Sequence, residues 1–328
     1  MRLRTALAAL ALLAVPGLAG CGGEPATAAA GEGGRFTLRI GTIGTGNRLT
    51  GPTGWWHSKG KLVPALSGIG VTDVKVVTFP NGPDLNQALV AGELDLASYG
   101  DTPALVAKGA GQPTKLIAQS VVNNDAGILA KKNGGPASVK DLQGKKVAVQ
   151  TGSYIHRYLL GALADAGVKP AEIIHLYSTD TEAALERGDV DAAAVPAINY
   201  EVLKAKGYPG IDQASADHPG YRGTSATVVT DKFLAAHKDI VTAWQQVQRD
   251  ATKEAKANWD DYLTFAVSLV QFPPDLVKKT TVKDQLPDEP FSDEGIKLLD
   301  GTRKFLVENK FIKKEFTLDE WIAPGARA

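Results

Sequence analysis

The chain has 328 residues, and its 36 Lys and Arg are balanced by 36 Asp and Glu. This balance excludes the strongly basic face that a nucleic-acid-binding protein needs. Apolar residues make up 44% and charged residues 22%, a composition typical of a folded globular protein rather than a disordered one. The single cysteine excludes both a disulfide framework and a cysteine-based metal cluster, and we expect no metal site.

The first twenty residues have the three-part form of an export signal. Arg2 and Arg4 precede an apolar run, Ala6–Val15, that is shorter than the ~20 residues a bilayer span requires. The next four residues, 18–21, read Leu-Ala-Gly-Cys and contain the only cysteine. They resemble the lipobox of bacterial lipoproteins, in which the cysteine is lipidated. An ordinary cleavage site beside a chance cysteine is the alternative.

We therefore expect residues 1–20 to be a lipoprotein signal peptide and Cys21 to carry the lipid. The protein would then be exported and anchored to the outer face of the cytoplasmic membrane. Residues 21–35 are rich in Gly and Ala and lack apolar periodicity. Such a segment cannot bury much surface, so it is predicted to be a flexible tether.

From Phe36 onward, short apolar strands alternate with amphipathic helices. The predicted strands are Phe36–Ile40, Val74–Phe79, Leu94–Tyr99, Lys115–Val122, Gly127–Lys131 and Lys146–Gln150. One predicted helix occupies residues 83–92, and a second begins at Ser153 with an apolar stripe that runs to Ala166. After about Lys232 the pattern is almost purely helical. This alternation predicts an α/β fold built on doubly wound, mostly parallel sheets.

An internal repeat predicts two similar lobes. The pattern Ala-Leu-x-x-Gly-acid-apolar-Asp-x-Ala occurs at residues 88–97 and again at residues 184–193. In both copies a helix ends at a glycine and a strand follows. We expect the chain to cross between the lobes near residues 121–126 and 222–227. The first lobe would be discontinuous, with residues 36–122 and 225–328, and the second lobe would contain residues 123–224.

Candidate binding residues lie after predicted strands or at predicted helix starts, where open α/β sheets bind ligands. Each has a plain alternative, because Gly, Asp, Thr and Ser also form turns and helix caps. Trp55 and Trp56 can likewise stack on a ligand or anchor a helix to the core. The expected ligand-binding residues are Thr45, Gly46, Asn47, Trp55, Gly100, Asp101, Thr102, Gly152, Ser153, Tyr154 and Asn199.

Motifs of nucleotide binding and hydrolysis are missing from the sequence. There is no GxGxxG, no GxxxxGK[ST] and no GxSxG elbow. We therefore expect no cofactor and no enzymatic activity.

Five segments carry a resemblance to a known family, namely residues 79–85, 99–104, 138–150, 152–156 and 186–191. They resemble the substrate-binding proteins of ABC importers for aliphatic sulfonates, taurine and nitrate, most closely the aliphatic-sulfonate branch. This resemblance implies a type II periplasmic-binding fold whose two lobes close on a small anionic organic solute. It also implies delivery to a membrane permease by a protein that we expect to be a monomer.

One departure from that family concerns the second lobe. Many relatives carry Trp-x-x-Trp-Asp-Pro-Tyr where this chain has Ala193–Tyr200, so the aromatic wall of the second lobe is largely missing. An exported sensor or scaffold lipoprotein is one alternative function. An enzyme on the same fold, related to thiamine-pyrimidine synthesis, is the other.

The resemblance and the helix starts together suggest how an anion is held. Lobe closure is predicted to bring the helix starts at residues 100–102 and 152–154 to one point. Each helix end offers free N–H groups and a partial positive charge of about half a unit. Two such ends can bind an anionic head without a buried arginine. Asp101 would repel an anion, so we expect it to cap its own helix or to pair with an amine of the ligand.

Overall fold

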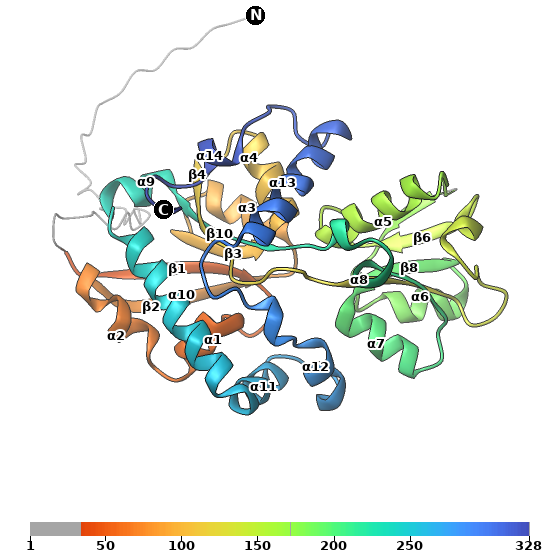
Figure 1. Ribbon diagram of the computed structural model, residues 1–328, viewed down its shortest axis with the longest axis horizontal. Helices are drawn as coiled ribbons and strands as arrows, with labels where there is room; N and C mark the ends of the chain where they lie inside the picture. The colour runs from red at the N-terminus through yellow and green to blue at the C-terminus, as the bar shows by residue number, and fades with distance from the viewer. Residues whose placement is uncertain (1–33, 171, 328) are drawn as a thin grey trace, which may run out of the picture. The chain divides into compact units, whose positions relative to one another are not determined.

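Two five-stranded sheets organise the computed structural model, which describes residues 34–170 and 172–327 (Figure 1). The first sheet has the order β2-β1-β3-β10-β4. Its strands are β1 (Phe36–Ile43), β2 (Val71–Phe79), β3 (Leu96–Gly100), β4 (Thr114–Ala118) and β10 (Ser225–Thr230). The second sheet has the order β7-β6-β8-β5-β9. Its strands are β5 (Ala126–Ala130), β6 (Lys146–Val149), β7 (Glu172–His175), β8 (Ala192–Pro196) and β9 (Gly210–Gln213). The predicted signal peptide and Cys21 lie outside the described residues.

Each sheet is parallel except for one strand. β1 is parallel to β2 and β3, and β6 is parallel to β7 and β8. β10 and β5 are each antiparallel to both of their neighbours. These two strands are the first that the chain forms after each crossing from one sheet to the other. The predicted α/β fold with two mostly parallel sheets is confirmed.

Helices cover the sheets and form the C-terminal part of the chain. Those before β4 are α1 (Gly51–Ser58), α2 (Leu62–Leu66), α3 (Gly82–Val90) and α4 (Asp101–Gly109). Those between β6 and β10 are α5 (Tyr154–Asp165), α6 (Thr181–Arg187), α7 (Ala197–Ala205) and α8 (Ala214–Asp217). The rest are α9 (Asp231–Ala236), α10 (Ile240–Ala257), α11 (Trp259–Ser268), α12 (Pro274–Thr280), α13 (Asp293–Glu308) and α14 (Leu318–Trp321). None of the described helices is long and apolar enough to cross a membrane.

The internal repeat corresponds to the same local structure in both sheets. Gly92 and Gly188 follow α3 and α6 with φ of +74° each, the left-handed conformation that glycine adopts at low cost. The aspartate that precedes the next strand then binds the strand alongside. Asp95 accepts a hydrogen bond from the Arg39 N–H of β1, and Asp191 accepts one from the Lys146 N–H of β6. The repeat therefore encodes how each strand docks on its neighbour.

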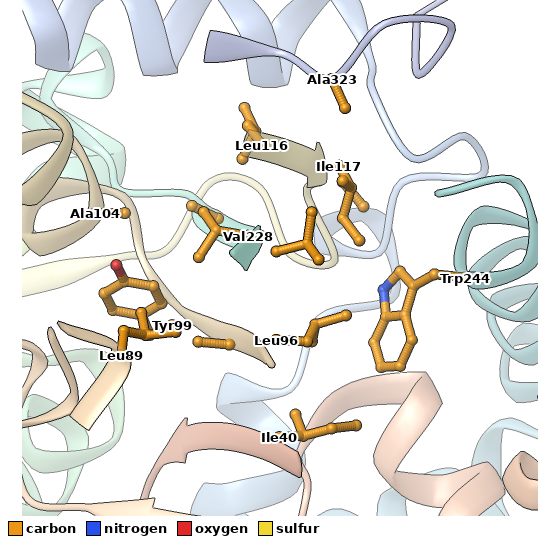
Figure 2. Packing of buried hydrophobic residues seen from close by; sticks show 14 of the residues in the cluster. Ile40, Leu89, Leu96, Tyr99, Ala104, Leu116, Ile117, Val228, Trp244 and Ala323 are labelled. Atoms are coloured by element: carbon orange, nitrogen blue, oxygen red, sulfur yellow. The ribbon is translucent and has the colours of Figure 1, made fainter. Parts of the chain in front are cut away.

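The core of the first sheet is the larger of the two. Figure 2 shows Ile40, Leu96 and Val228 of three adjacent strands beside Trp244 of α10. The second sheet has a separate apolar cluster on each face. Val147 and Val149 belong to the cluster that contains α5, whereas Ala148 belongs to the cluster that contains Tyr200. This alternation follows from the period of two along a strand.

Two crossing segments connect the sheets. The chain passes from β4 to β5, and it returns from β9 to β10. The segments pair with each other, because the Asn124 N–H donates to the Gly223 carbonyl at 2.8 Å and the Gly223 N–H donates back at 3.0 Å. We keep residues 36–122 with 225–328 as the proposed first lobe and residues 123–224 as the proposed second lobe.

Candidate functional site

A cavity of about 400 Å³ lies beyond the carboxyl end of β1, and we call it the Arg48 cavity. The end of β1 and the loop that follows it contribute Ile43, Gly44, Thr45, Arg48 and Thr50. Helices α11 and α12 and the residues beside them contribute Ala266, Leu269, Val270, Val277, Thr280 and Thr281. Ile198 comes from α7, which packs on β5 and β8 of the second sheet. The wall is therefore built from elements that belong to both sheets.

Arg48 is the only charged side chain that lines this cavity. Its guanidinium donates to the Ser268 carbonyl at 2.7 Å and to the Ser268 hydroxyl at 2.8 Å. No carboxylate of the described residues lies within ion-pair distance of it. Two neutral acceptors fix the guanidinium without cancelling its charge, so the cavity has an uncompensated positive group.

The start of α1 adds to this positive character. Thr50 is its N-cap, makes no side-chain capping bond, and is followed by a first turn without acidic residues. Free N–H groups at a helix start favour a negative charge.

The apolar part of the wall is formed by side chains such as Ile198, Leu269 and Val277. Hydroxyl groups of Thr45, Thr280 and others lie among them. The cavity therefore has one charged end and a largely apolar remainder. Its volume lies within the range of about 300–1,000 Å³ that is typical of small-molecule sites.

The three predicted loop residues after β1 have different places. Thr45 lines the Arg48 cavity. Gly46 has a φ of +74° and Asn47 a φ of +50°, so both shape the turn. The Asn47 amide oxygen accepts from the Thr78 N–H and hydroxyl, both at 3.2 Å, which ties the turn to β2. Binding roles for Gly46 and Asn47 remain predictions.

Trp55 lies in the core and not on a ligand surface, which corrects the expectation that it stacks on a ligand. It is 2% exposed and packs edge-on against Tyr262, with 6.0 Å between the ring centroids. The Lys59 ammonium lies over the same ring at 3.8 Å. A large aromatic side chain on a short helix stabilises the fold most where it is fully buried. Its neighbour Trp56 donates from its indole to Glu254 at 3.0 Å.

Asp101 and Thr102 lie at the start of α4, where the Asp101 carboxylate is completely buried. It accepts hydrogen bonds from the Thr102 N–H at 2.6 Å and from the Thr224 N–H at 3.0 Å. The Thr302 hydroxyl of α13 donates to it at 3.1 Å. The N-cap of α4 is Gly100, which makes no side-chain capping bond, and the negative charge at this helix start comes from Asp101 in the first turn. Binding by Gly100 and Thr102 remains a prediction.

The start of α5 is also occupied by internal hydrogen bonds. The Ser153 hydroxyl accepts from the His156 N–H at 3.3 Å and donates to the Gln150 carbonyl at 2.6 Å. Gly152, with a φ of +77°, lies close to Pro83 of α3. The Tyr154 hydroxyl donates to the Asp125 carbonyl at 3.1 Å, and burial raises the pKa of this phenol. Binding roles for Gly152, Ser153 and Tyr154, and for Asn199 of α7, remain predictions.

Arg157 connects α5 with the first lobe. It is 2% exposed, and its guanidinium donates to the Thr302 hydroxyl at 2.7 Å. Since Thr302 also donates to Asp101, one hydroxyl separates the two buried charges. Burial lowers the pKa of Arg157, and the Asp101 carboxylate opposes this effect.

A second cavity, of about 330 Å³, adjoins the first, and we call it the Asp125 cavity. It is lined on one side by residues of the second lobe and its crossing segments, among them Asp125, Glu201, Gln213 and Arg222. Lys279 and Thr280 of α12 and Asp284 lie on the other side. Its lining is thus far more charged than that of the Arg48 cavity.

Sequence reasoning missed Arg48 and the lining from α11 and α12. Arg48 directly follows the expected binding residues Thr45, Gly46 and Asn47, so its position was a usable signal. The residues from 266 to 281 gave no signal in the sequence, because only tertiary packing brings them to the end of β1. Among the described residues, no group of His, Cys, Asp and Glu could hold a metal ion.

The profile of the NMT1/THI5-like family matches residues 70–261, which is more than half of the chain. The chain belongs to this family. A Bacillus subtilis protein named as an aliphatic sulfonates-binding protein is 29% identical over 310 residues, which cover 92% of this chain and 90% of that protein. The taurine-binding periplasmic protein of Escherichia coli is 32% identical over 189 residues, or 56% of this chain and 58% of that protein.

Solved structures share the fold of this family member. The periplasmic aliphatic sulphonate binding protein SsuA of Escherichia coli superposes with a TM-score of 0.69 at 24% identity, covering 87% of this chain and 97% of that one. The desulfurization enzyme DSZB superposes with a TM-score of 0.67 at 17% identity, covering 89% and 97%. The predicted two-lobed periplasmic-binding fold is confirmed, and it is a fold that binding proteins and an enzyme share.

Proposed function

We propose that the chain is an extracytoplasmic solute-binding lipoprotein of an ABC importer. It captures a small anionic organic solute, an aliphatic sulfonate or a similar anion, between its two lobes and delivers the solute to a membrane permease. The names of its relatives and its fold support this function. The observation that carries it is the uncompensated Arg48 guanidinium in a cavity with walls from both lobes.

The geometry suits a solute with one anionic end. Sulfonate oxygens would accept from Arg48 and from the free N–H groups at the start of α1. A charge-assisted hydrogen bond of this kind contributes about 1.5–3 kcal/mol. The hydrocarbon part would lie against Ile198, Leu269 and Val277, where each buried CH₂ adds about 0.8 kcal/mol. Neither contribution requires a bond to be made or broken.

A thermal-shift screen tests the proposed function. The probes are methanesulfonate, butanesulfonate and taurine, together with nitrate, sulfate and a neutral alcohol of equal chain length. A ligand present at one hundred times its dissociation constant should stabilise the protein by about 2.7 kcal/mol. We expect stabilisation by the organic sulfonates and none by the alcohol. Stabilisation by none of the anions would overturn the proposal.

Membrane attachment through Cys21 is part of the same proposal. The tether of residues 21–35 would let the lobes reach the permease while the lipid holds the chain at the membrane. Replacing Cys21 by Ser should release the protein into the soluble fraction, because the lipid supplies the anchoring energy. If the variant stays with the membrane after a carbonate wash, the anchor lies elsewhere.

We propose that the chain binds its solute without converting it to another compound. The fold alone does not decide this, because the enzyme DSZB shares it. The only cysteine is Cys21, next to the predicted signal peptide, so no thiol lies in the two lobes. Mass spectrometry after prolonged incubation with the best solute should recover it unchanged, and conversion of the solute at a rate proportional to protein concentration would favour the enzyme.

A further inference from the structure

The Arg48 cavity and the Asp125 cavity meet at a shared lining residue. Thr280, in the last turn of α12, lines both of them. Its neighbours divide between the two, with Val277 in the Arg48 cavity and Lys279 in the Asp125 cavity. On the facing helix α7, Ile198 lines the first cavity and Glu201 lines the second. The last turn of α12 and the first turns of α7 therefore form the wall.

An ion pair between Lys279 and Glu201 connects α12 with α7 at this wall. The Lys279 ammonium lies 2.7 Å from the Glu201 carboxylate, and the two residues are 78 positions apart in the chain. The Glu201 side chain is only 14% exposed, whereas that of Lys279 is 59% exposed. Figure 1 shows α12 beside α7, with one helix from the C-terminal region and the other from the second lobe.

The two cavities differ in polarity, and this difference affects how long a solute can be when it binds. A hydrocarbon tail gains free energy against the apolar residues of the Arg48 cavity. It gains none beyond the wall, where Asp125, Glu201 and Lys279 require hydration or partners. A tail that is too long must also separate the α12–α7 contact.

We propose that the Lys279–Glu201 pair determines specificity by setting the longest solute that the Arg48 cavity accepts. This inference rests on the proposed function and deepens it, because it assigns the limit on chain length to two named residues. The pair closes the end of the cavity at Thr280, so tails up to that wall bind progressively better and longer tails bind worse.

The test measures dissociation constants by calorimetry for linear alkanesulfonates from methanesulfonate to decanesulfonate. For the wild-type protein, the dissociation constant should fall about fourfold for each added CH₂. It should then rise about tenfold at the first chain that is too long. In the double variant Glu201→Ala with Lys279→Ala, this limit should move to longer chains while methanesulfonate binds within twofold of wild type.

Two further variants separate specificity from general damage. The control Glu182→Ala with Lys206→Ala removes a pair of the same residue types, with its charged atoms 2.6 Å apart, on the surface of the second lobe. It should leave the limit unchanged. The swap Glu201→Lys with Lys279→Glu restores an ion pair and should restore the wild-type limit. A double alanine variant that binds every chain as wild type does overturns the inference, whereas failure of wild type to bind any sulfonate overturns the proposed function.

Discussion

The start of α4 and the start of α1 are two helix ends of the first lobe with opposite charge arrangements. At α4, the completely buried Asp101 carboxylate accepts two backbone N–H groups and the Thr302 hydroxyl. At α1, no side chain caps the helix, and Arg48 nearby has only neutral partners. The first end is complete without a ligand, whereas the second has positive charge that nothing in the described chain balances.

This difference separates a structural helix end from a binding one. A helix start attracts an anion in either case. Where the protein provides that anion itself, removing it should reduce stability and should not specifically reduce binding. Where an external solute provides it, removing the positive group should reduce binding and leave stability nearly unchanged. Four measurements test this comparison.

The largest effect is expected for Asp101→Asn. The substitution keeps the shape of the side chain but replaces a charged acceptor of four hydrogen bonds, and it leaves the buried Arg157 without its nearby negative charge. Breaking a buried charged network typically costs about 3–5 kcal/mol. Urea denaturation of the variant and wild type at pH 7 measures the loss. A cost below about 1 kcal/mol would mean that Asp101 is not a structural part of the α4 start.

The second largest effect concerns solute affinity in Arg48→Gln. Loss of a charge-assisted contact should weaken binding of the best sulfonate by about 1.5–3 kcal/mol, measured by calorimetry. Stability should change by less than about 0.5 kcal/mol, because Arg48 is exposed and no carboxylate of the described residues pairs with it. Arg35→Gln, at another exposed arginine, is the matched control. Equal affinity in both variants would remove Arg48 from the binding site.

The contrast also shows how far the sequence could lead. The repeat at residues 88–97 and 184–193 and the strand–helix alternation were sufficient for the two-sheet fold, since glycine caps and strand periodicity are local signals. Helix starts were equally visible. The sequence could not show which helix start already has its charge balanced by the protein. The partners of Asp101 at Thr224 and Thr302 lie 123 and 201 residues away. The burial of Trp55 against Tyr262 likewise depends on packing that no local pattern contains.

The third prediction moves to the second lobe. Ser153 caps α5, and its hydroxyl hydrogen is already donated to the Gln150 carbonyl. Ser153→Ala should therefore cost about 1 kcal/mol of stability, the usual value of a lost N-cap. The affinity for the best sulfonate should stay within twofold of wild type. A tenfold or larger loss of affinity in this variant would instead favour the start of α5 as the anion site and would reverse the comparison.

The smallest effect is a dependence of stability on pH through His156 in the first turn of α5. Burial lowers the pKa of this imidazole, and the neighbouring His175 lowers it further. The neutral ring can accept the hydrogen bond from the Gly152 N–H, which lies 3.4 Å from Nδ1, and the protonated ring cannot. Folding therefore favours the neutral form.

The direction of the pH effect follows from this lowered pKa. Above the unfolded-state pKa of about 6.5, neither the folded nor the unfolded chain protonates His156, so stability is unaffected. As the pH falls below that value, the unfolded chain binds the proton first and the free energy of unfolding decreases, until the folded imidazole is protonated as well. His156→Asn keeps an acceptor near the Nδ1 position but does not titrate. Urea denaturation at several pH values between 8 and 5 should show wild-type stability declining relative to the variant only below about pH 6.5. A difference that is constant over this range, or that grows in favour of the wild type in acid, would mean that the start of α5 does not depend on a neutral imidazole.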